Sequence, residues 1–534
     1  MMDQATASPH TVAGKLRLRR YHQARWNEPI LFELSRPGQR GILVPPLEPD
    51  MRDATGDVLA ALPAGLQRLR PPQLPELSQN QVLRHYLRLS QENLGADLNI
   101  DVGQGTCTMK YSPKINDQFA RHHKIADLHP LQDEETIQGI LEIYFRFEQI
   151  LKEISGMDRF SLQPAAGSAA IYANASIIRA YHLARGAPER DEIITTIFSH
   201  PSNAACARTA GFKIITLHPD PSGYPDLAAL RASVSTRTAG MLITNPEDTG
   251  IFNPRIGEFV EVVHQAGGLC AYDQANANGL LGITRAREAG FDLCHFNLHK
   301  TFSSPHGCGG PAVGATGVTR ELAAFLPIPV VEFDGSSYHL DYDRPASIGK
   351  VGPFLGVAPV VLRSYAWVMS LGAKGLREVA EIAVLNNNYL LAKMLQIPGV
   401  SAPYATGKRR IEQVRYSWER LSKETGVHSE EIGLRAADFG VHYWTSHHPH
   451  IVPEPCTLEP TESYSKDDLD EYAAILAHVA EEARLDPGLV KTAPHNSTIH
   501  TIDHAPLDDP ARWAITWRAH LRKNIKRGNP EREP

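Results

Sequence analysis

Cysteine is scarce in this sequence of 534 residues, and no Cys-X-X-Cys pair is present. The six cysteines are scattered along the chain, at Cys107, Cys206, Cys270, Cys294, Cys308 and Cys456. This distribution is typical of reduced thiols and argues against a disulfide framework or a cysteine-based zinc site. The sequence also lacks an uninterrupted apolar stretch of the roughly 20 residues that a membrane-spanning helix needs. We therefore expect a protein without a membrane span.

Basic charge is not in excess either. The formal net charge is −6 and charges of both signs are mixed, which argues against nucleic-acid binding and against a lipid-directed basic surface. The basic stretch at residues 15–26 lacks the apolar core of a secretory signal. A transit peptide stays open as an alternative, and a cytoplasmic location is the expectation.

The chain is long enough to bury a large core. With 42% hydrophobic residues, it should form two or three domains. Residues 1–135 are rich in proline and turns and predict an N-terminal arm or extension. Residues 136–340 alternate between strands and helices and predict a large domain. Residues 341–534 combine long helices with short strands, which indicates a smaller C-terminal α/β domain.

The middle part predicts an α/β fold with a mainly parallel sheet. Short apolar or β-branched runs at residues 192–198, 213–218, 240–244, 268–273 and 293–298 are typical of buried strands. Residues 135–156 and 255–268 carry the apolar spacing of helices. Such alternation places helices on the faces of the sheet. Ligands of these sheets bind beyond the carboxyl ends of the strands.

Two of these strands end near residues of opposite charge, Asp273 and Lys300. Lys300 follows an apolar run and precedes a glycine-rich turn, so burial would favour the neutral amine, which can attack a carbonyl. Pyridoxal 5'-phosphate (PLP) requires an amine for its aldehyde and an anion for its pyridinium nitrogen. A solvated strand-end lysine and a helix-capping aspartate are the alternatives, and spacing alone does not decide between them.

Motifs along nearly the whole chain resemble one family, subunit 2 of the decarboxylating glycine dehydrogenase, the P-protein of the glycine cleavage system. They include EPILFELSRPGQRG (28–41), TCTMKYSPKIN (106–116), AYDQANANG (271–279), FNLHKTFSSPHG (296–307), TLEPTES (457–463) and APHNSTIH (493–500). The resemblance implies the PLP-dependent transferase fold type I, which is aminotransferase-like, with PLP bound as an imine on Lys300. It also implies a homo- or hetero-oligomer in which residues 347–352 reach the neighbouring active site.

The resemblance supports further contacts to the cofactor. Gly167 permits a sharp turn, and the amides of Ser168 and Ala169 would open a helix, which makes a phosphate seat. This motif is weak alone and gains weight from its match to the family. His200 falls on the family's histidine, which stacks on the pyridine ring. The remaining expected contacts are Ala275 against the ring, Asn245 toward its phenolic oxygen, and His299 and Thr301 near the phosphate. A turn role is the alternative for Asn245.

The activity implied by the resemblance is the PLP-dependent decarboxylation of glycine. Asp273 would keep the ring nitrogen protonated, and the aminomethyl group would pass to the lipoyl disulfide of H-protein. That disulfide is the oxidant, so no nicotinamide site is needed. No convincing Gly-X-Gly-X-X-Gly motif lies in a βαβ setting. A homologous subunit 1 would be the partner chain.

Several positions depart from the family pattern. Glu247 and Asp248 replace an Asn-Thr pair, which would add two negative charges near the predicted pocket. Two alternatives therefore stay open: a diverged PLP enzyme that acts on another amino acid or acceptor, and a non-catalytic partner subunit. A histidine-rich stretch matches no standard ligand spacing, so we expect no metal there; its members are His442, His447, His448 and His450.

Overall fold

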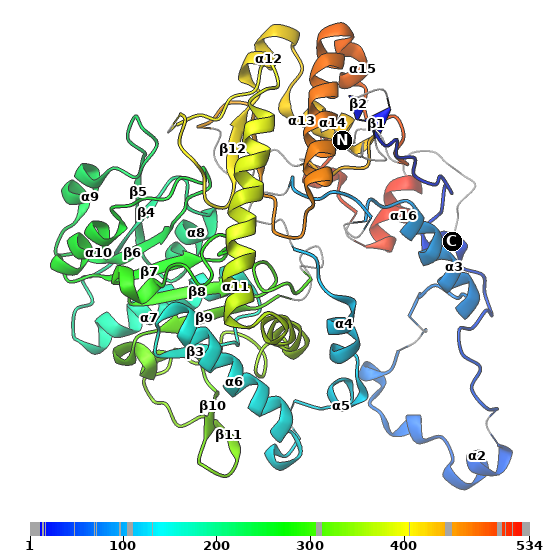
Figure 1. Ribbon diagram of the computed structural model, residues 1–534. Coiled ribbons are helices and arrows are strands. Elements are labelled where there is room, and N and C mark those ends of the chain that lie inside the picture. The colour runs from blue at the N-terminus through cyan, green and yellow to red at the C-terminus, as the bar shows by residue number, and fades with distance from the viewer. Residues whose placement is uncertain are drawn as a thin grey trace, which may run out of the picture. The chain divides into compact units, whose positions relative to one another are not determined.

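Figure 1 shows the computed structural model of the chain. The described residues are 11–12, 15–16, 18–46, 48–68, 70, 72–95, 98–103, 110–130, 132–305, 312–404, 406–443, 451–498, 505–507, 509–514 and 516–525. Contacts divide the chain into two compact units. The first comprises Met1–Arg20 and Ala96–Thr492, and the second comprises Tyr21–Gly95 and Ala493–Pro534. The domain boundaries expected near residues 135 and 340 both fall within the first unit and stay a prediction.

The first unit is built on a sheet in which the described residues form seven strands, in the order β3-β9-β8-β7-β6-β4-β5. Their bounds are β3 Arg159–Ser161, β4 Glu192–Thr196, β5 Lys213–Leu217, β6 Thr238–Thr244, β7 Leu269–Gln274, β8 Leu293–Asn297 and β9 Gly314–Val318. The pairs from β5 to β8 are parallel, whereas β9 is antiparallel to both β8 and β3. The prediction of a mainly parallel sheet is confirmed, and all five expected strands lie in it.

Helices cover both faces of this sheet (Figure 1). Successive side chains of a strand point to opposite faces. In β7, Cys270 and Tyr272 accordingly pack in one core, and Leu269 and Ala271 pack in another. The first core includes α6 (Gln138–Ser155), α9 (Leu227–Ser233), α10 (Ile256–Gln265) and the first part of α11 (Ala358–Met394). The second includes α7 (Gly167–Ala184) and α8 (Pro201–Thr209).

A third core of the same unit surrounds the antiparallel ribbon of β12 (Val414–Ser417) and β13 (Pro455–Leu458). Around it lie α12 (Glu419–Thr425), α13 (Ser429–Ala437), α14 (Lys466–Leu485) and α15 (Pro487–Lys491). Helix α11 links this core to the sheet, because Val360 packs beside the sheet and Leu390 packs beside the ribbon. The helix changes direction at Gly372, whose φ of 63° lies in the region that favours glycine.

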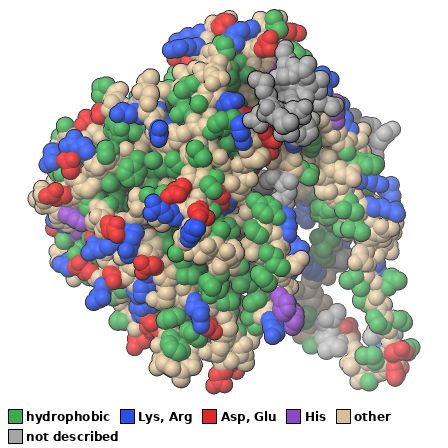
Figure 2. Space-filling view, viewed as in Figure 1, with side chains coloured by type: hydrophobic (Ala, Val, Ile, Leu, Met, Phe, Trp, Pro, Cys, Tyr) green, Lys and Arg blue, Asp and Glu red, His purple; other side chains and the backbone are tan. Residues whose placement is uncertain are grey.

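The remaining elements of the first unit are β1 (Thr11–Val12), β2 (Lys15–Leu16), α4 (Lys114–Ala120), α5 (His123–Ala126), β10 (Val330–Phe333) and β11 (Tyr338–Asp341). The second unit contains α1 (Leu31–Leu34), α2 (Pro49–Thr55), α3 (Gln79–Gln91) and α16 (Trp517–Ile525). In the part of the chain that is described, no helix has the length and hydrophobicity to cross a bilayer. On the face shown in Figure 2, acidic and basic side chains are interspersed.

Gln163 fixes the loop that leads from β3 to α7. Its buried side chain donates to the carbonyl oxygens of Ile328 (2.8 Å) and Phe354 (3.0 Å). Its carbonyl oxygen accepts from the amides of Val351 (2.7 Å) and Gly352 (3.3 Å). One side chain thus joins the segment before α7 to the segment that precedes β10 and to the one that follows β11.

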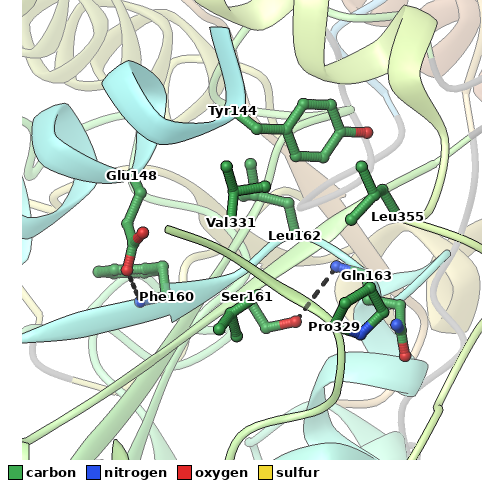
Figure 3. Close-up of a pocket in the computed structure, with 10 residues that line it drawn as sticks. Tyr144, Glu148, Phe160, Ser161, Leu162, Gln163, Pro329, Val331 and Leu355 are labelled. Carbon is green, nitrogen blue, oxygen red and sulfur yellow. Dashed lines mark hydrogen bonds between the residues drawn. The ribbon is translucent and has the colours of Figure 1, made fainter. Parts of the chain in front are cut away.

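A small cavity lies beside this residue and is lined by Tyr144, Leu162, Pro329 and Leu355, among others (Figure 3). Its volume of about 20 Å³ has room for roughly one water molecule. The cavity is therefore too small for a cofactor, and its lining serves to pack α6 against β3.

Replacing Gln163 with alanine should lower the free energy of unfolding by about 3 kcal/mol, because several buried backbone groups lose their partners. Urea denaturation of the apoprotein measures this change. Gln149 lies exposed on α6, so Gln149→Ala should shift stability by less than about 0.5 kcal/mol. Equal effects of the two substitutions would contradict the anchoring role of Gln163.

Candidate active site

The register of the sheet brings three polar side chains together at the carboxyl ends of its strands. Asp273 on β7 pairs with Thr244 on β6 and with His295 on β8. Asp273 also points to the same face as Ala271, which is the face covered by α7 and α8. The site therefore lies where the topology of a parallel α/β sheet predicts it.

Asp273 is buried and its carboxylate is held by several donors. Asn203 of α8 donates to Oδ2 at 2.7 Å, and the Thr244 hydroxyl donates to the same oxygen at 3.2 Å. The amide of Ala275 donates to Oδ1 at 3.0 Å. His295 Nε2 lies 3.3 Å from that oxygen. A carboxylate that is buried with this many donors is stabilised in its charged form.

The pKa of Asp273 follows from two opposing effects. Burial raises the pKa of the carboxyl, whereas the nearby imidazoles of His295 and His200 and the donors Asn203 and Ala275 lower it. The lowering effects are stronger together, so the pKa lies below its ordinary value and the group is ionised at neutral pH. Burial lowers the pKa of His295, which the charge of Lys300 lowers further.

Lys300 is buried, with 5% of its surface exposed. It lies in the turn after β8, and its amide donates to the carbonyl oxygen of Asn297 at 3.1 Å. Strands β7 and β8 are parallel neighbours, so Asp273 at the end of β7 and Lys300 after β8 are both buried at the same edge of the sheet. The charge of Lys300 also lowers the pKa of His295, which lies 3.3 Å from Asp273.

The start of α7 fits a phosphate group. Ala166 provides no side-chain cap, so the first amides of the helix, at Gly167, Ser168 and Ala169, have no capping acceptor there. A Cβ at Gly167 would lie 2.5 Å from the Asn297 side-chain amide, which would have to move to make room for it. The Asn297 amide oxygen is buried with no hydrogen-bond partner among the described residues. The backbone amides at the start of α7 therefore suit the phosphate group of PLP.

His200 stands at the N-terminus of α8, half-buried. Its Nδ1 accepts from the amide of Ser202 at 3.2 Å and lies 2.6 Å from the Ser202 hydroxyl. With Nδ1 acting as an acceptor, the neutral ring carries its proton on Nε2. These contacts fix the orientation of the ring, and the protonated form of His200 lowers the pKa of Asp273.

The other expected cofactor contacts have clear protein partners. Asn245 exchanges hydrogen bonds with the backbone of Asn253 at 2.8 and 3.3 Å, as its alternative turn role requires. Thr301 accepts from the amide of Ala277 at 2.8 Å, which braces the Lys300 turn. His299 Nδ1 lies 3.2 Å from the carbonyl oxygen of Val313. Ala275 is half-buried. Their contacts with the cofactor stay a prediction.

Several polar residues at this site were not predicted from the sequence. Asn203, Thr244 and His295 surround the carboxylate of Asp273. In the sequence, His295 stands out as a single histidine within an apolar strand, and this pattern could have indicated its role. Lys110, in the TCTMKYSPKIN motif, is also buried. Its Nζ lies 3.0 Å from Glu462 Oε2 and 4.7 Å from the centre of the Trp367 ring.

The two acidic residues that depart from the family pattern do not add two negative charges. Asp248 is buried and forms an ion pair with Arg415, whose guanidinium is fully buried. Burial raises the pKa of Glu247 to about 8, against a weaker lowering effect from Thr196. Burial thus favours the protonated form of Glu247 at neutral pH, and Arg415 balances the charge of Asp248, a contact that the sequence does not reveal.

Among the described residues, one group of three potential metal ligands has its ligand atoms close together: His264, Cys270 and Asp292. It lies at the amino ends of β7 and β8, opposite the site. Two of the cysteines and three residues of the histidine-rich stretch lie outside the described part of the chain: Cys107, Cys308, His447, His448 and His450.

Comparison with known proteins identifies the family. Residues 168–316 match the aminotransferase class-V family, and residues 379–506 match the glycine dehydrogenase C-terminal domain. By structure, the chain is similar to a glycine decarboxylase (P-protein) in inhibitor-bound form, with a TM-score of 0.69, 21% identity and coverage of 82% of this chain and 100% of the other. A NifS-like protein matches with a TM-score of 0.55, 13% identity and coverage of 72% and 99%. These likenesses confirm the predicted fold.

Curated relatives extend the match over almost the whole chain. A probable glycine dehydrogenase (decarboxylating) subunit 2 from Pyrococcus horikoshii is 46% identical over 503 residues, which cover 94% of this chain and 98% of the relative. Its counterpart from Halalkalibacterium halodurans is 42% identical over 477 residues, with coverage of 89% and 96%. The chain therefore belongs to the glycine dehydrogenase (decarboxylating) subunit 2 family.

Proposed function

We propose that this chain decarboxylates glycine with PLP attached to Lys300, and that it works with a subunit 1 and with the lipoyl group of H-protein. The observation that carries the proposal is the buried cluster of Lys300, His295 and Asp273 in a chain of this family. Neither a solvated lysine nor a simple helix cap explains an amine and a carboxylate buried around one histidine.

Each residue of the cluster has a task that its geometry supports. When bound, PLP supplies an aldehyde that an amine can join and a protonated ring that accepts an electron pair from Cα. Lys300 provides the amine. Asp273, ionised and held by its donors, stabilises a positive charge placed opposite it. The amides of Gly167, Ser168 and Ala169 would hold the phosphate.

His200 would lie over the ring and handle protons there. Its Nδ1 is engaged by Ser202, so the proton on Nε2 is the one available to a group bound beside Asp273. Burial of Lys300, Asp273 and His295 also keeps water away from the amine, which favours release of carbon dioxide over competing reactions.

The structure also bears on the choice of substrate. Two extra negative charges near the pocket would repel the substrate carboxylate and would favour a different amino acid. Because Arg415 neutralises Asp248 and a proton neutralises Glu247, these residues together bring no net negative charge at neutral pH. This balance supports glycine as the substrate.

Lys300→Ala tests the proposal. The variant should lose the cofactor that borohydride fixes to the chain, as measured by peptide mass spectrometry, because the only proposed attachment amine is gone. Exchange of labelled bicarbonate into glycine, with subunit 1 and lipoylated H-protein present, should fall about a thousandfold. Lys374, on α11, is the matched control, because its side chain is 91% exposed. Fixation at another lysine, or exchange that survives in Lys300→Ala, would refute the proposal.

Glu247→Gln tests the protonated state of the buried carboxyl. Since the folded pKa of about 8 lies above the ordinary value of 4.5, ionisation in the unfolded chain destabilises the native protein progressively as pH rises between these values. The glutamine variant lacks this penalty, so its stability relative to the parent should increase over that range, by at most roughly 5 kcal/mol.

Urea denaturation at about pH 5, 7 and 9 measures this difference. Glu261→Gln removes an exposed carboxyl of α10 and should show no comparable dependence on pH. If the difference in the free energy of unfolding between Glu247→Gln and the parent stays constant across this range, Glu247 is ionised in the native protein. That result would contradict the proposal that a proton neutralises Glu247.

A further inference from the structure

Ser303 stands three residues after Lys300, in the lysine turn (residues 297–304), and its backbone has a conformation that serine rarely adopts. Its φ of 60° lies in the left-handed region, where the Cβ of an L residue is crowded. The residue is also buried, with 1% of its surface exposed. Such strain persists only where the surrounding contacts fix it, and it is concentrated at functional sites. The contacts of Ser303 therefore indicate what the strained turn does.

The left-handed conformation of Ser303 closes the lysine turn. The amide of Lys300 donates to the carbonyl oxygen of Asn297 at 3.1 Å, and the amide of Ser303 donates to that of Lys300 at 3.2 Å. After the change of direction at Ser303, the amide of Ser304 returns to the carbonyl oxygen of Leu298 at 3.3 Å. The backbone of Lys300 is thus held on both sides by a turn that depends on this conformation.

The Ser303 hydroxyl connects the lysine turn to a distant part of the chain. It donates to the carbonyl oxygen of Tyr111 at 2.6 Å. Tyr111 follows Lys110 in the TCTMKYSPKIN motif, so the contact joins two segments that carry family motifs. The free energy of this hydrogen bond offsets part of the strain at Ser303.

The backbone of Tyr111 is itself held in place. Its amide donates to the hydroxyl oxygen of Ser463 at 2.8 Å, in the loop after β13. The amine of Lys110 lies 3.0 Å from Glu462 Oε2 and 4.7 Å from the centre of the Trp367 ring on α11. A buried ammonium between a carboxylate and an aromatic face is restrained by both. Residues 110 and 111 thus form a fixed support for the lysine turn.

A purely structural role for Ser303, as a residue that only closes a turn, is the alternative. Glycine would serve that role better, because glycine adopts a positive φ without steric cost. Serine adds a hydroxyl that glycine lacks, and this hydroxyl is bonded to Tyr111. A buried serine at this φ therefore favours a role in which the hydrogen bond to the support matters.

We propose that Ser303 is a positioning residue for Lys300, because its hydroxyl ties the lysine turn to the backbone of Tyr111. Ser463 holds that backbone from the other side. This inference rests on the proposed function in taking Lys300 as the amine that joins PLP. The amine must be oriented toward the aldehyde when the two meet, and the rate of joining falls when that orientation is lost. Ser303 acts on this rate only through the backbone of Lys300.

Hydrogen exchange in the apoprotein tests the hydrogen bond to Tyr111 without any cofactor. Ser303→Ala removes the hydroxyl and keeps the crowding at positive φ, whereas Ser303→Gly removes both. The amides of the lysine turn should exchange about tenfold faster in both variants, because the loss of one neutral hydrogen bond favours local opening by about that factor. Mass spectrometry of peptides that cover the turn measures these rates.

The rate at which PLP joins Lys300 tests the positioning role. Samples of apoprotein and PLP are fixed with borohydride at intervals, and peptide mass spectrometry gives the labelled fraction at Lys300. The rate should fall about tenfold in both Ser303 variants. Ser303→Gly should nevertheless resist urea better than Ser303→Ala, since glycine relieves the strain. A purely structural role would instead make the rate follow stability.

Three further variants complete the experiment. Ser463→Ala removes the acceptor of the Tyr111 amide and should lower the rate by a smaller factor, whereas Ser463→Thr keeps a hydroxyl and should restore it. Ser417→Ala is the matched control, because the Ser417 hydroxyl belongs to a buried residue of β12 and donates to the carbonyl oxygen of Pro453 at 2.6 Å. Its loss should lower stability and leave both the exchange of the lysine turn and the joining of PLP unchanged.

Exchange or joining at the parent's rate in a folded Ser303→Ala protein would overturn the inference. An equal loss in Ser417→Ala, or a rate that follows stability across the variants, would overturn it as well. These results would leave the attachment of PLP to Lys300 intact. If borohydride fixes no cofactor at Lys300 of the parent, the proposed function fails instead, whatever the exchange of the lysine turn shows.

Discussion

The buried carboxylate of Asp273 is the group on which the arrangement of the active site depends. An ionised group without water is tolerated only when donors surround it. Its hydrogen-bond donors come from β6, α8 and the turn after β7, and the imidazole of His295 on β8 lies 3.3 Å from it. The register of three strands and the position of one helix must therefore be correct together, and the same elements then place Lys300 and the start of α7.

The C-terminal part of the first unit also contributes charged groups that contact the segments around the active site. Arg415 neutralises Asp248, and Glu459 accepts hydrogen bonds from Asn276 and Asn278 in the segment after Asp273. These contacts flank the β12–β13 ribbon, which lies far along the chain from the strands that carry the site. The ribbon and its core thus set the charge of the site as well as completing the fold.

Local patterns were sufficient to predict the strands, the helices and the two central residues. Each buried strand is a short apolar run, and Asp273 and Lys300 stand where such runs end. Partners brought together by tertiary contacts were not predictable in this way. Asn203 lies in a helix without a marked pattern, and the neutralisation of Asp248 depends on Arg415, which is distant in sequence. The Asn245 side chain is likewise occupied by hydrogen bonds with the backbone of Asn253, which no local sequence pattern indicates.

A crystal structure of the PLP-bound protein tests the central claim most directly. It should show the cofactor joined to Lys300 Nζ, with its ring nitrogen within about 3 Å of an Asp273 oxygen and its phosphate at the start of α7. A cofactor attached elsewhere, or a ring nitrogen that faces away from Asp273, would contradict the account.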